Sequence, residues 1–528
     1  MNVATAPETT HAPAPHNPVR WSSYLIFAFC ATLYLLPFMR VIIVGRDEGT
    51  FLYGAVRILH GQIFARDFYE AMGPGTFYWL AAFYKLFGAT FLASRINLFI
   101  TSLGTALALY YLSCQVCTRY RVLPSLILAG ACFGGIWPGI SHHIDSNFLG
   151  LLSVTCLVLW NINNRSSVLF LAGLFAGATT CIHQTKGVLL LLAFLVWLLI
   201  QRRKTKSSLA AAGIIIGGYC FVVALVLIYF WYHGALGSLA FANFVFPLKH
   251  NGAVNSVSYA LNIYTDYWTP WVIASGGKGW MIAIASILII PLLFIAVLPL
   301  LLLIISIRYK WKSVTPVVVL YWVCGWAIWL SELHRKDIDH LVFGSPVLVI
   351  VFIHALTANR GRIVNVLLQI LAISAVFLAA FNCVTVLFAG ANTTVTRVGN
   401  VAVIGRASIL TYMNAHTSPG EEILVYPYCP TYYFLSATTN PTPYSLLLYN
   451  YNTPSQYREV IDILEYHRIK YVIWDTTFEE KTAEKFQRLQ QIRPEDHLIE
   501  PYLDSHYRMV EDDHGIKIME RKDIGLAK

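Results

Sequence analysis

The feature that most constrains this sequence is a series of long apolar runs. Eleven of them are long enough, or nearly long enough, to cross a bilayer as helices, which takes about 20 residues each. A chain that is 57% hydrophobic and 12% charged has too little polar surface for a soluble fold. The sequence therefore predicts a mainly α, polytopic membrane helix bundle with about eleven transmembrane helices. The runs cover residues 22–44, 91–113, 122–140, 146–162, 167–182, 187–201, 208–232, 280–307, 313–330, 341–358 and 363–389.

The acidic residues divide the chain into two parts. Residues 1–389 contain ten of the 28 Asp and Glu side chains, and residues 390–528 contain the other eighteen. We therefore expect a transmembrane domain over residues 22–389 and a small soluble domain after it. Residues 1–21 are rich in Ala, Pro, Thr and His, a composition that predicts a disordered N-terminus.

The short connections between apolar runs indicate the orientation. Alternate connections carry basic residues and no acid, which is typical of cytoplasmic loops: Arg119 and Arg121; Arg165; Arg202, Arg203, Lys204 and Lys206; Arg308, Lys310 and Lys312; Arg360 and Arg362. Every acid before residue 390 except Glu8 lies in the other connections, which include two long outer loops at 45–90 and 233–279. The N-terminus is thus predicted to be cytoplasmic and the C-terminal domain periplasmic, in a bacterial inner membrane. This topology accounts for much of the net charge of +10, so we exclude nucleic-acid binding.

The C-terminal part has the pattern of a small α/β domain. Segments 422–427, 470–475 and 515–520 are predicted strands, and 454–469 and 478–492 are predicted amphipathic helices. No phosphate-binding Gly loop, nucleophile elbow or metal cluster is recognisable in it. The domain is therefore interpreted as a scaffold or a cap that docks the acceptor.

Charged groups at the edge of a membrane domain are costly and often mark a site. Five clusters fall on the predicted outer side, which allows them to converge on one cavity. They are Arg46-Asp47-Glu48; Arg66-Asp67 with Glu70; His142-His143-Ile144-Asp145; the segment from Glu332 to His340; and His183 with Lys186.

Group transfer from a lipid phosphate requires a base for the acceptor and cations for the departing phosphate. The Asp47-Glu48 pair supplies a carboxylate. Cationic side chains that suit phosphate are Arg335, Lys336 and His340, with Arg57, His183 and Lys186 as further candidates.

Simpler interpretations of these residues stay open. Asp47 also fits a solvated charge at a helix end, and Asp145 fits an ordinary helix N-terminus. Residues of the outer loop offer ligands for a divalent cation, but mixed His/Asp loops are common, so we assign no metal and no certain cofactor. The residues concerned are His334, Asp337, Asp339 and His340.

Three segments together resemble the GT-C superfamily of membrane glycosyltransferases. They are the Asp47-Glu48 pair after the first run, the stretch from Arg66-Asp67-Phe-Tyr-Glu70 to Gly73-Pro-Gly-Thr-Phe-Tyr-Trp79, and His340-Leu-Val-Phe-Gly-Ser-Pro346. The most similar families are the protein O-mannosyltransferases and the aminoarabinose (lipid A) transferases.

This resemblance implies a polyprenyl-phosphate sugar donor and inverting transfer on the periplasmic or lumenal side. It implies that Asp47 is the base, with Glu48 as its neighbour, and that Asp145 is a second acid of the site. The family often carries a Lys-Pro-Pro segment for the donor phosphate, where this chain has Met72-Gly73-Pro74-Gly75. Phosphate binding is therefore assigned to Arg335, Lys336 and His340.

We expect an integral membrane glycosyltransferase that acts on an envelope lipid, glycan or protein. The catalytic residues would be Asp47, Glu48 and Asp145, and the substrate-binding residues Arg57, Asp67, Glu70, His143, His183, Lys186, Arg335, Lys336 and His340. The alternative is a transporter or flippase of lipid-linked saccharides, which predicts an internal repeat and charges near mid-membrane. A non-catalytic envelope scaffold is a third possibility.

Overall fold

The computed structural model describes most of the chain. The described residues are 21–45, 47–132, 139–202, 208–249, 257–308, 314–358, 361–390, 392–449, 451–485 and 497–525. Arg46, nearly all of the N-terminal segment predicted to be disordered, and several of the basic connections lie outside these ranges.

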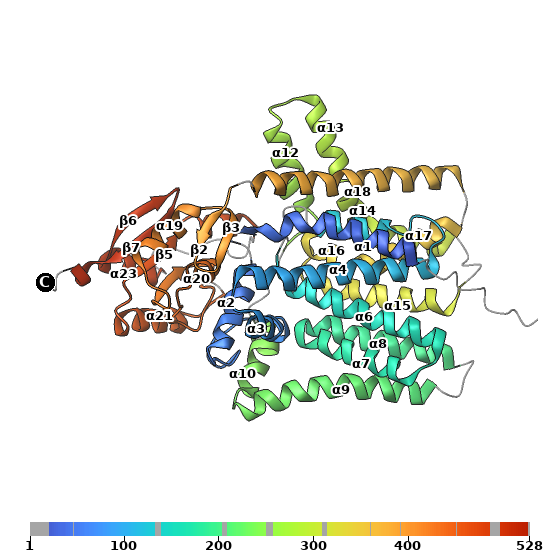
Figure 1. Ribbon diagram of the computed structural model, residues 1–528, viewed down its shortest axis with the longest axis horizontal. Coiled ribbons are helices and arrows are strands. Elements are labelled where there is room, and N and C mark those ends of the chain that lie inside the picture. The colour runs from blue at the N-terminus through green and yellow to red at the C-terminus, as the bar shows by residue number, and fades with distance from the viewer. Residues whose placement is uncertain are drawn as a thin grey trace, which may run out of the picture.

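The membrane part is a bundle of helices that run along the long axis of the molecule, with the C-terminal domain at one end (Figure 1). Every predicted apolar run that is described contains a helix. The bundle helices are α1 (Trp21–Leu35), α4 (Phe91–Val116), α5 (Leu123–Cys132), α6 (His142–Asn163), α7 (Ser166–Ile182), α8 (Gln184–Arg202), α9 (Ser208–Tyr232), α13 (Gly279–Leu288), α14 (Ile290–Arg308), α15 (Pro316–Glu332), α16 (Ile338–Gly344), α17 (Pro346–Ala358) and α18 (Arg362–Ala389).

The predicted count of eleven spans is not confirmed. Seven stretches of the described chain are long and apolar enough to cross a membrane, or eight if the bent pair α16 and α17 counts as one span. That pair was predicted as a single run, 341–358, but it bends by 65°. The break comes at Pro346, which has no N–H to continue a helix. Other runs, such as α5 with ten residues and α7 with seventeen, are apolar but shorter.

Small residues set how closely the bundle packs. On α7, a Cβ atom added to Gly173 would lie 2.2 Å from the carbonyl oxygen of Ile215 on α9. One added to Gly218 on α9 would lie 2.4 Å from the carbonyl of Phe170. The two backbones therefore touch directly, as in small-residue packing between membrane helices. The opposite face of α9 is covered with exposed apolar side chains, which suits contact with lipid.

The first apolar run leaves the bundle earlier than predicted. After α1 the chain passes through the 3-10 turn η1 (Leu36–Arg40) and forms β1 (Val41–Ile43). The sequence pattern predicts these three residues as part of the first span. Their β-branched side chains suit a strand, and β1 pairs in parallel with β3 (Gly399–Ile404). With β2 (Thr394–Thr396) antiparallel to β3, the first span is joined to the C-terminal domain through the sheet β1-β3-β2.

The C-terminal domain contains a second, mixed sheet of order β4-β5-β7-β6. Three of its strands lie where the sequence predicts them, and β6 was missed. The predicted helix after Thr453 is also present, opened by a capping box with Gln456. The elements are α19 (Ala407–His416), β4 (Ile423–Tyr426), α20 (Thr431–Ser436), α21 (Pro454–Tyr466), β5 (Tyr471–Asp475), α22 (Phe478–Lys485), α23 (Ile499–His506), β6 (Tyr507–Asp513), β7 (Ile516–Arg521) and the short turn η6 (Lys522–Gly525).

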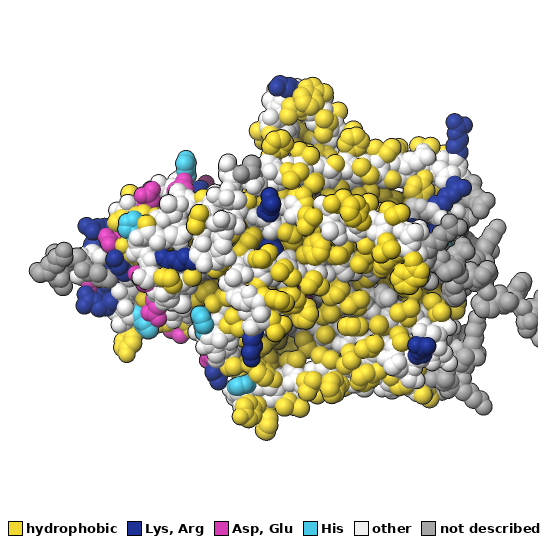
Figure 2. Space-filling view, viewed as in Figure 1, with side chains coloured by type: hydrophobic (Ala, Val, Ile, Leu, Met, Phe, Trp, Pro, Cys, Tyr) yellow, Lys and Arg dark blue, Asp and Glu magenta, His cyan; other side chains and the backbone are white. Residues whose placement is uncertain are grey.

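Short helices of the two outer loops lie near the end of the bundle that faces this domain. They include α2 (Glu48–Leu59), α3 (Gly75–Phe87), α10 (Leu236–Ala240) and α12 (Thr269–Ala274), with π-helical turns η2 (Phe241–Val245) and η3 (Ile263–Trp268). Figure 2 shows apolar side chains spread over the bundle and acidic side chains gathered on the C-terminal domain. The visible surface thus follows the division of charge in the sequence.

Candidate active site

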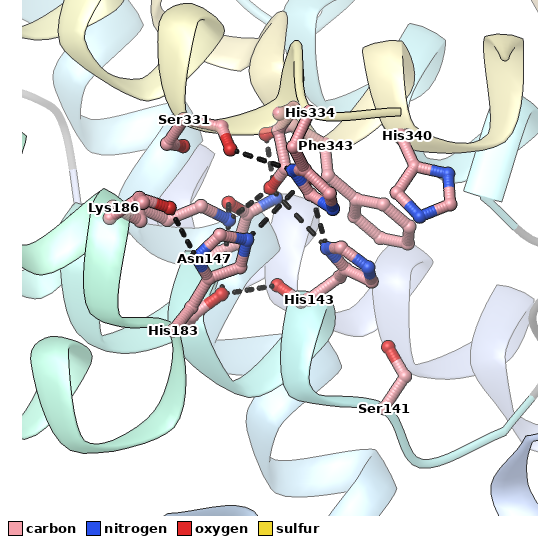
Figure 3. A network of polar contacts seen from close by, with 12 residues as sticks. Ser141, His143, Asn147, His183, Lys186, Ser331, His334, His340 and Phe343 are labelled. Atoms are coloured by element: carbon pink, nitrogen blue, oxygen red, sulfur yellow. Dashed lines mark hydrogen bonds and ion pairs between the residues drawn. The ribbon is translucent and has the colours of Figure 1, made fainter. Parts of the chain in front are cut away.

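A buried polar network lies at one end of the bundle, where α6, α8 and α15 meet (Figure 3). Its centre is Glu332, the last residue of α15, whose side chain is fully buried. Lys186 on α8 places its Nζ 2.7 Å from Oε1 of this carboxylate. The imidazoles of His143 and His183 lie beside Oε2, with nearest nitrogens at 3.1 and 3.7 Å. One carboxylate thus gathers a lysine from α8 and two histidines, one from α6 and one from the junction of α7 and α8.

Lys186 is held by two further acceptors. Its ammonium donates to Ser146 Oγ at 3.0 Å and to Asn147 Oδ1 at 2.8 Å, both on α6. Asn147 in turn donates to the carbonyl of Phe343 on α16. All three ammonium protons have acceptors, so the position of this buried cation is fixed from three sides.

The loop after α15 carries the cations that the sequence assigned to phosphate. Asp337 caps α16 and accepts from Arg335 at 2.7 Å and from His340 Nδ1 at 2.5 Å. The side chain of Lys336 is exposed. His340 lies edge-on to His143, with ring centroids 4.8 Å apart. The structure therefore places His340 at the network, with Arg335 attached to it through Asp337.

The four-residue divalent-cation site considered from the sequence does not form as a unit. Asp337 is engaged as above, and Asp339 accepts a hydrogen bond from Tyr267 Oη at 2.9 Å. Among the described residues, the groups whose ligand atoms lie close together instead combine His142, His143 and His183, or His183, Glu332 and His334.

The two adjacent carboxylates of the first outer loop have different surroundings. Asp47 is exposed, and its Oδ1 accepts a hydrogen bond of 2.9 Å from Tyr428 of the C-terminal domain. The same tyrosine hydroxyl lies 3.1 Å from Thr50 Oγ1. The C-terminal domain therefore contacts the proposed base directly, which the sequence did not indicate.

Glu48, by contrast, is buried in an ion pair with Arg95 of α4. Arg95 reaches both carboxylate oxygens and also donates to the carbonyl of Val41 in β1. The amide of Ile140 donates to the same carboxylate at 2.9 Å. These contacts hold the start of α2 against the bundle.

Asp145 lies on α6, two residues after His143, and is buried. Ser141 caps this helix by accepting from the amide of Ile144, so the N-cap is Ser141 and Asp145 occupies the first turn. None of the described contacts of Glu332 involves Asp145. It therefore lies beside the network without belonging to it.

Arg57, Asp67 and Glu70 form a separate group at the boundary with the C-terminal domain. The Arg57 guanidinium is buried and donates to the carbonyls of Thr442, at 3.0 Å, and Asp67, at 3.3 Å. The Asp67 carboxylate pairs with its exposed neighbour Arg66 at 2.8 Å. Burial raises the pKa of Glu70 to about 7, although Arg57 acts in the opposite direction. The group joins the interfacial loop to the C-terminal domain.

An apolar cavity of about 200 Å³ extends from the membrane-facing helices to the polar network. Its walls come from α1, α4 and α5, and its inner end is formed by Ile144, Asn147 and Phe343. Asn147 thus contacts both the cavity and Lys186. An apolar chain in this space would present its polar end to the network.

Sequence reasoning left several of these residues unassigned. Glu332 was recognised only as a member of a charged segment, and His334 only as a possible ligand of a divalent cation. Tyr428 and Arg95 were not singled out. A single Arg inside an apolar run, as Arg95 is, does signal a buried partner. For Tyr428 no signal exists in the sequence, because its contact with Asp47 joins distant parts of the chain.

No protein-family model matches this chain, and no curated protein matches it in sequence. Among solved structures it is similar to ArnT from Cupriavidus metallidurans. The structure bound to undecaprenyl phosphate gives a TM-score of 0.57 at 11% identity, over 95% of this chain and 98% of ArnT. The apo structure gives 0.56 at 13% identity, over 94% and 98%. Arabinosyltransferase EmbB from Mycobacterium smegmatis gives 0.30 at 14% identity, over 70% of this chain and 43% of EmbB, a score too low to indicate a common fold.

The similarity to ArnT covers nearly the whole of both chains. It confirms the fold expected from the sequence, a membrane helix bundle followed by a small sheet-containing domain. With identities of 11% and 13%, what the two proteins are shown to share is this fold.

Proposed function

We propose that this protein is an integral membrane glycosyltransferase that moves a sugar from a polyprenyl-phosphate donor to an envelope acceptor. The observation that carries the proposal is the apolar cavity whose inner end, at Asn147, meets the buried network of Lys186 and the histidines. A polyprenyl phosphate combines these two properties in one molecule, because a long apolar chain ends in an anion. The ArnT structure of the same fold holds undecaprenyl phosphate.

In the proposed reaction Asp47 acts as the general base. Its carboxylate takes the proton of the acceptor hydroxyl or amine while the acceptor atom attacks the anomeric carbon of the sugar. The bond from that carbon to the donor phosphate breaks, and the phosphate leaves with the electron pair, so the configuration inverts. The hydrogen bond from Tyr428 fixes the direction of the carboxylate. Exposure of Asp47 leaves it accessible to an acceptor from outside.

Cationic and neutral donors of the outer loop would hold the departing phosphate. We assign this role to Arg335, Lys336 and His340, with Lys186, His143 and His183 at the inner end of the cavity. Preorganised positive charge at the leaving group stabilises the transition state more than the ground state. This arrangement replaces the Lys-Pro-Pro segment that the chain lacks.

The other two predicted acids receive supporting roles in the proposal. Glu48 positions the start of α2, and with it Asp47, through its ion pair with Arg95. Asp145, buried in the first turn of α6, positions the helix end that carries His143. Arg57, Asp67 and Glu70 shape the acceptor side next to the C-terminal domain.

The orientation follows the acidic residues. We propose that the N-terminus is cytoplasmic and that the network, Asp47 and the C-terminal domain face the periplasm of a bacterial inner membrane. Lipid-linked donors and envelope acceptors would then meet on one side.

Complementation of a deletion strain tests the assignment of the base. Full-length Asp47→Asn should reach the membrane at the wild-type level and fail to restore the envelope glycan that disappears in the deletion strain, as measured by mass spectrometry. Asp504→Asn, which changes an exposed carboxylate of the C-terminal domain in the same way, should restore it fully. Full restoration by Asp47→Asn would exclude this residue as the base.

A further inference from the structure

We propose that His183, Glu332 and His334 form a binding site for a zinc-class transition-metal ion at the outer end of the bundle. One ligand atom from each of the three side chains lies within 4.8 Å of the other two. The residues come from the α7–α8 junction and from the end of α15, segments far apart in the sequence (Figure 3). The site shares His183 with the group assigned to the donor phosphate, whereas Glu332 and His334 have no role in the proposed transfer reaction.

The donor atoms select the class of metal. Two imidazole nitrogens and one carboxylate oxygen are the ligands of many zinc sites, whereas Mg²⁺ and Ca²⁺ prefer oxygen ligands. His183 Nε2 lies 3.7 Å from Glu332 Oε2. Two ligands of one tetrahedral zinc ion are separated by roughly 3.4 Å, given metal–ligand bonds of about 2.1 Å. A side-chain movement of a few tenths of an ångström would bring this pair to the required spacing.

The outer nitrogens of the two histidines are already occupied. His183 Nδ1 lies 3.1 Å from the hydroxyl of Thr185, and His334 Nδ1 lies 3.1 Å from the carbonyl oxygen of Ser331. An imidazole that donates Nδ1–H to a carbonyl keeps the lone pair of Nε2 for a metal. Such partners are typical of histidines that bind metals, because they fix the ring and its tautomer.

The carboxylate of Glu332 is also held in position by a neighbouring side chain. Lys186 occupies Oε1 of Glu332 at 2.7 Å, and its other protons go to Ser146 and Asn147. Oε2 is buried, with nitrogens of His143 and His183 at 3.1 and 3.7 Å, and neither contact is a well-aligned hydrogen bond. Leaving a buried carboxylate oxygen without such a partner costs stability. A metal ion on Oε2 would satisfy that oxygen without displacing Lys186.

The site is open on one side. Glu332 and His183 are buried, whereas His334 is exposed. Three protein ligands leave the fourth tetrahedral position of the ion to an oxygen from solvent or substrate, as in catalytic rather than structural zinc sites. His142 and His143 share His183 in an overlapping group of possible ligands.

Metal binding to the full-length protein in detergent tests the proposal. The protein is purified with a tag free of histidine, stripped with a chelator and titrated with Co²⁺, followed by visible absorption, and with Zn²⁺, followed by elemental analysis. We expect about one equivalent per chain, unaffected by an equal concentration of Mg²⁺. His334→Ala should weaken metal binding at least about hundredfold. Because the His334 side chain is exposed, this substitution creates no cavity in the core. Thr185→Val, which removes only the partner of His183, should weaken it about 10- to 100-fold.

The controls separate this site from general histidine binding. His467→Ala alters an exposed histidine of the C-terminal domain and should leave the affinity unchanged. Wild-type affinity in His334→Ala, less than about 0.1 equivalent in the wild type, or displacement by equal Mg²⁺ would each overturn the proposal. The proposal would also be overturned if His142→Ala lost the metal while His334→Ala retained it. The measurement needs neither donor nor acceptor, so its outcome is independent of the proposed transferase activity.

Discussion

The buried Glu48–Arg95 ion pair predicts that substitutions of the neighbouring carboxylates Glu48 and Asp47 change the stability of the protein by very different amounts. Glu48 is 4% exposed and Arg95 2% exposed, so each charge depends on the other. Glu48→Gln removes the negative charge and leaves a buried guanidinium without a counterion. Breaking a buried ion pair by removing one partner costs about 3–5 kcal/mol of folding free energy. Asp47→Asn, at an exposed position, should change the stability by less than about 0.5 kcal/mol.

A double-mutant cycle measures the interaction itself. The single variants Glu48→Leu and Arg95→Met should each cost about as much as Glu48→Gln, because each leaves one charge of the pair buried and unpaired. The double variant Glu48→Leu with Arg95→Met contains no unpaired charge. It loses the hydrogen bonds to the carbonyl of Val41 and the amide of Ile140, at about 1–3 kcal/mol each. The double variant should therefore lose about 2–6 kcal/mol of folding free energy. This loss is smaller than the roughly 6–10 kcal/mol expected if the two substitutions acted independently.

Stability is measured by unfolding the purified, detergent-solubilised protein in denaturant, and the fraction that remains folded is determined by proteolysis. The single variants should unfold at clearly lower denaturant concentration than the wild type, while Asp47→Asn should match it. Additive costs in the double variant, or wild-type stability of Glu48→Gln, would show that the two side chains are not coupled in a buried pair.

Three further predictions concern the outer surface and the cavity. Burial raises the pKa of Glu70 to about 7 from 4.5, so its contribution to stability is complete below pH 4.5 and is lost as the pH rises through 7. In Glu70→Gln the melting temperature should therefore vary less between pH 5 and 8 than in the wild type; an equal variation with pH in the variant and the wild type would contradict this. Tyr428→Phe should lower kcat about tenfold or more without changing KM in a transfer assay, since a hydrogen bond to a charged group is worth about 1.5–3 kcal/mol; an unchanged kcat would show that Asp47 is positioned without it. Ala129→Phe narrows the cavity and should raise KM more for a long-chain than for a short-chain donor, whereas Leu25→Phe on the outer face of α1 should not; equal effects on both donors would place the lipid elsewhere.

Local patterns in the sequence were sufficient for most of the helices and for three of the four strands of the second sheet. Apolar runs predict membrane helices because backbone groups in lipid must be satisfied within the segment. The same reasoning could not count the spans, because Pro346 splits one run. Nor could it assign Val41–Ile43 to a strand, because that strand exists only through its pairing with β3.

The candidate site was predicted in its composition more than in its geometry. The charged clusters of the sequence include the segments that carry His143, His183, Lys186 and His340, and the structure brings these side chains together near Glu332. Which groups pair with one another depends on helix packing, which a single sequence does not encode in any local pattern. The separation of Asp47 from Glu48 illustrates this, because adjacent residues at the start of a helix point in different directions.

The pairing of β1 with β3 has a consequence for the order in which the protein is made. Val41 lies opposite Ala402, and the amide of Val44 bonds to the carbonyl of Ile404. The segment that leads into Asp47 therefore lacks its partner strand until the ribosome has synthesised almost the whole membrane part and its spans have been inserted. A nascent or truncated chain that ends before residue 404 would carry its Asp47 loop unanchored, so the protein would assemble this loop only near the end of biogenesis.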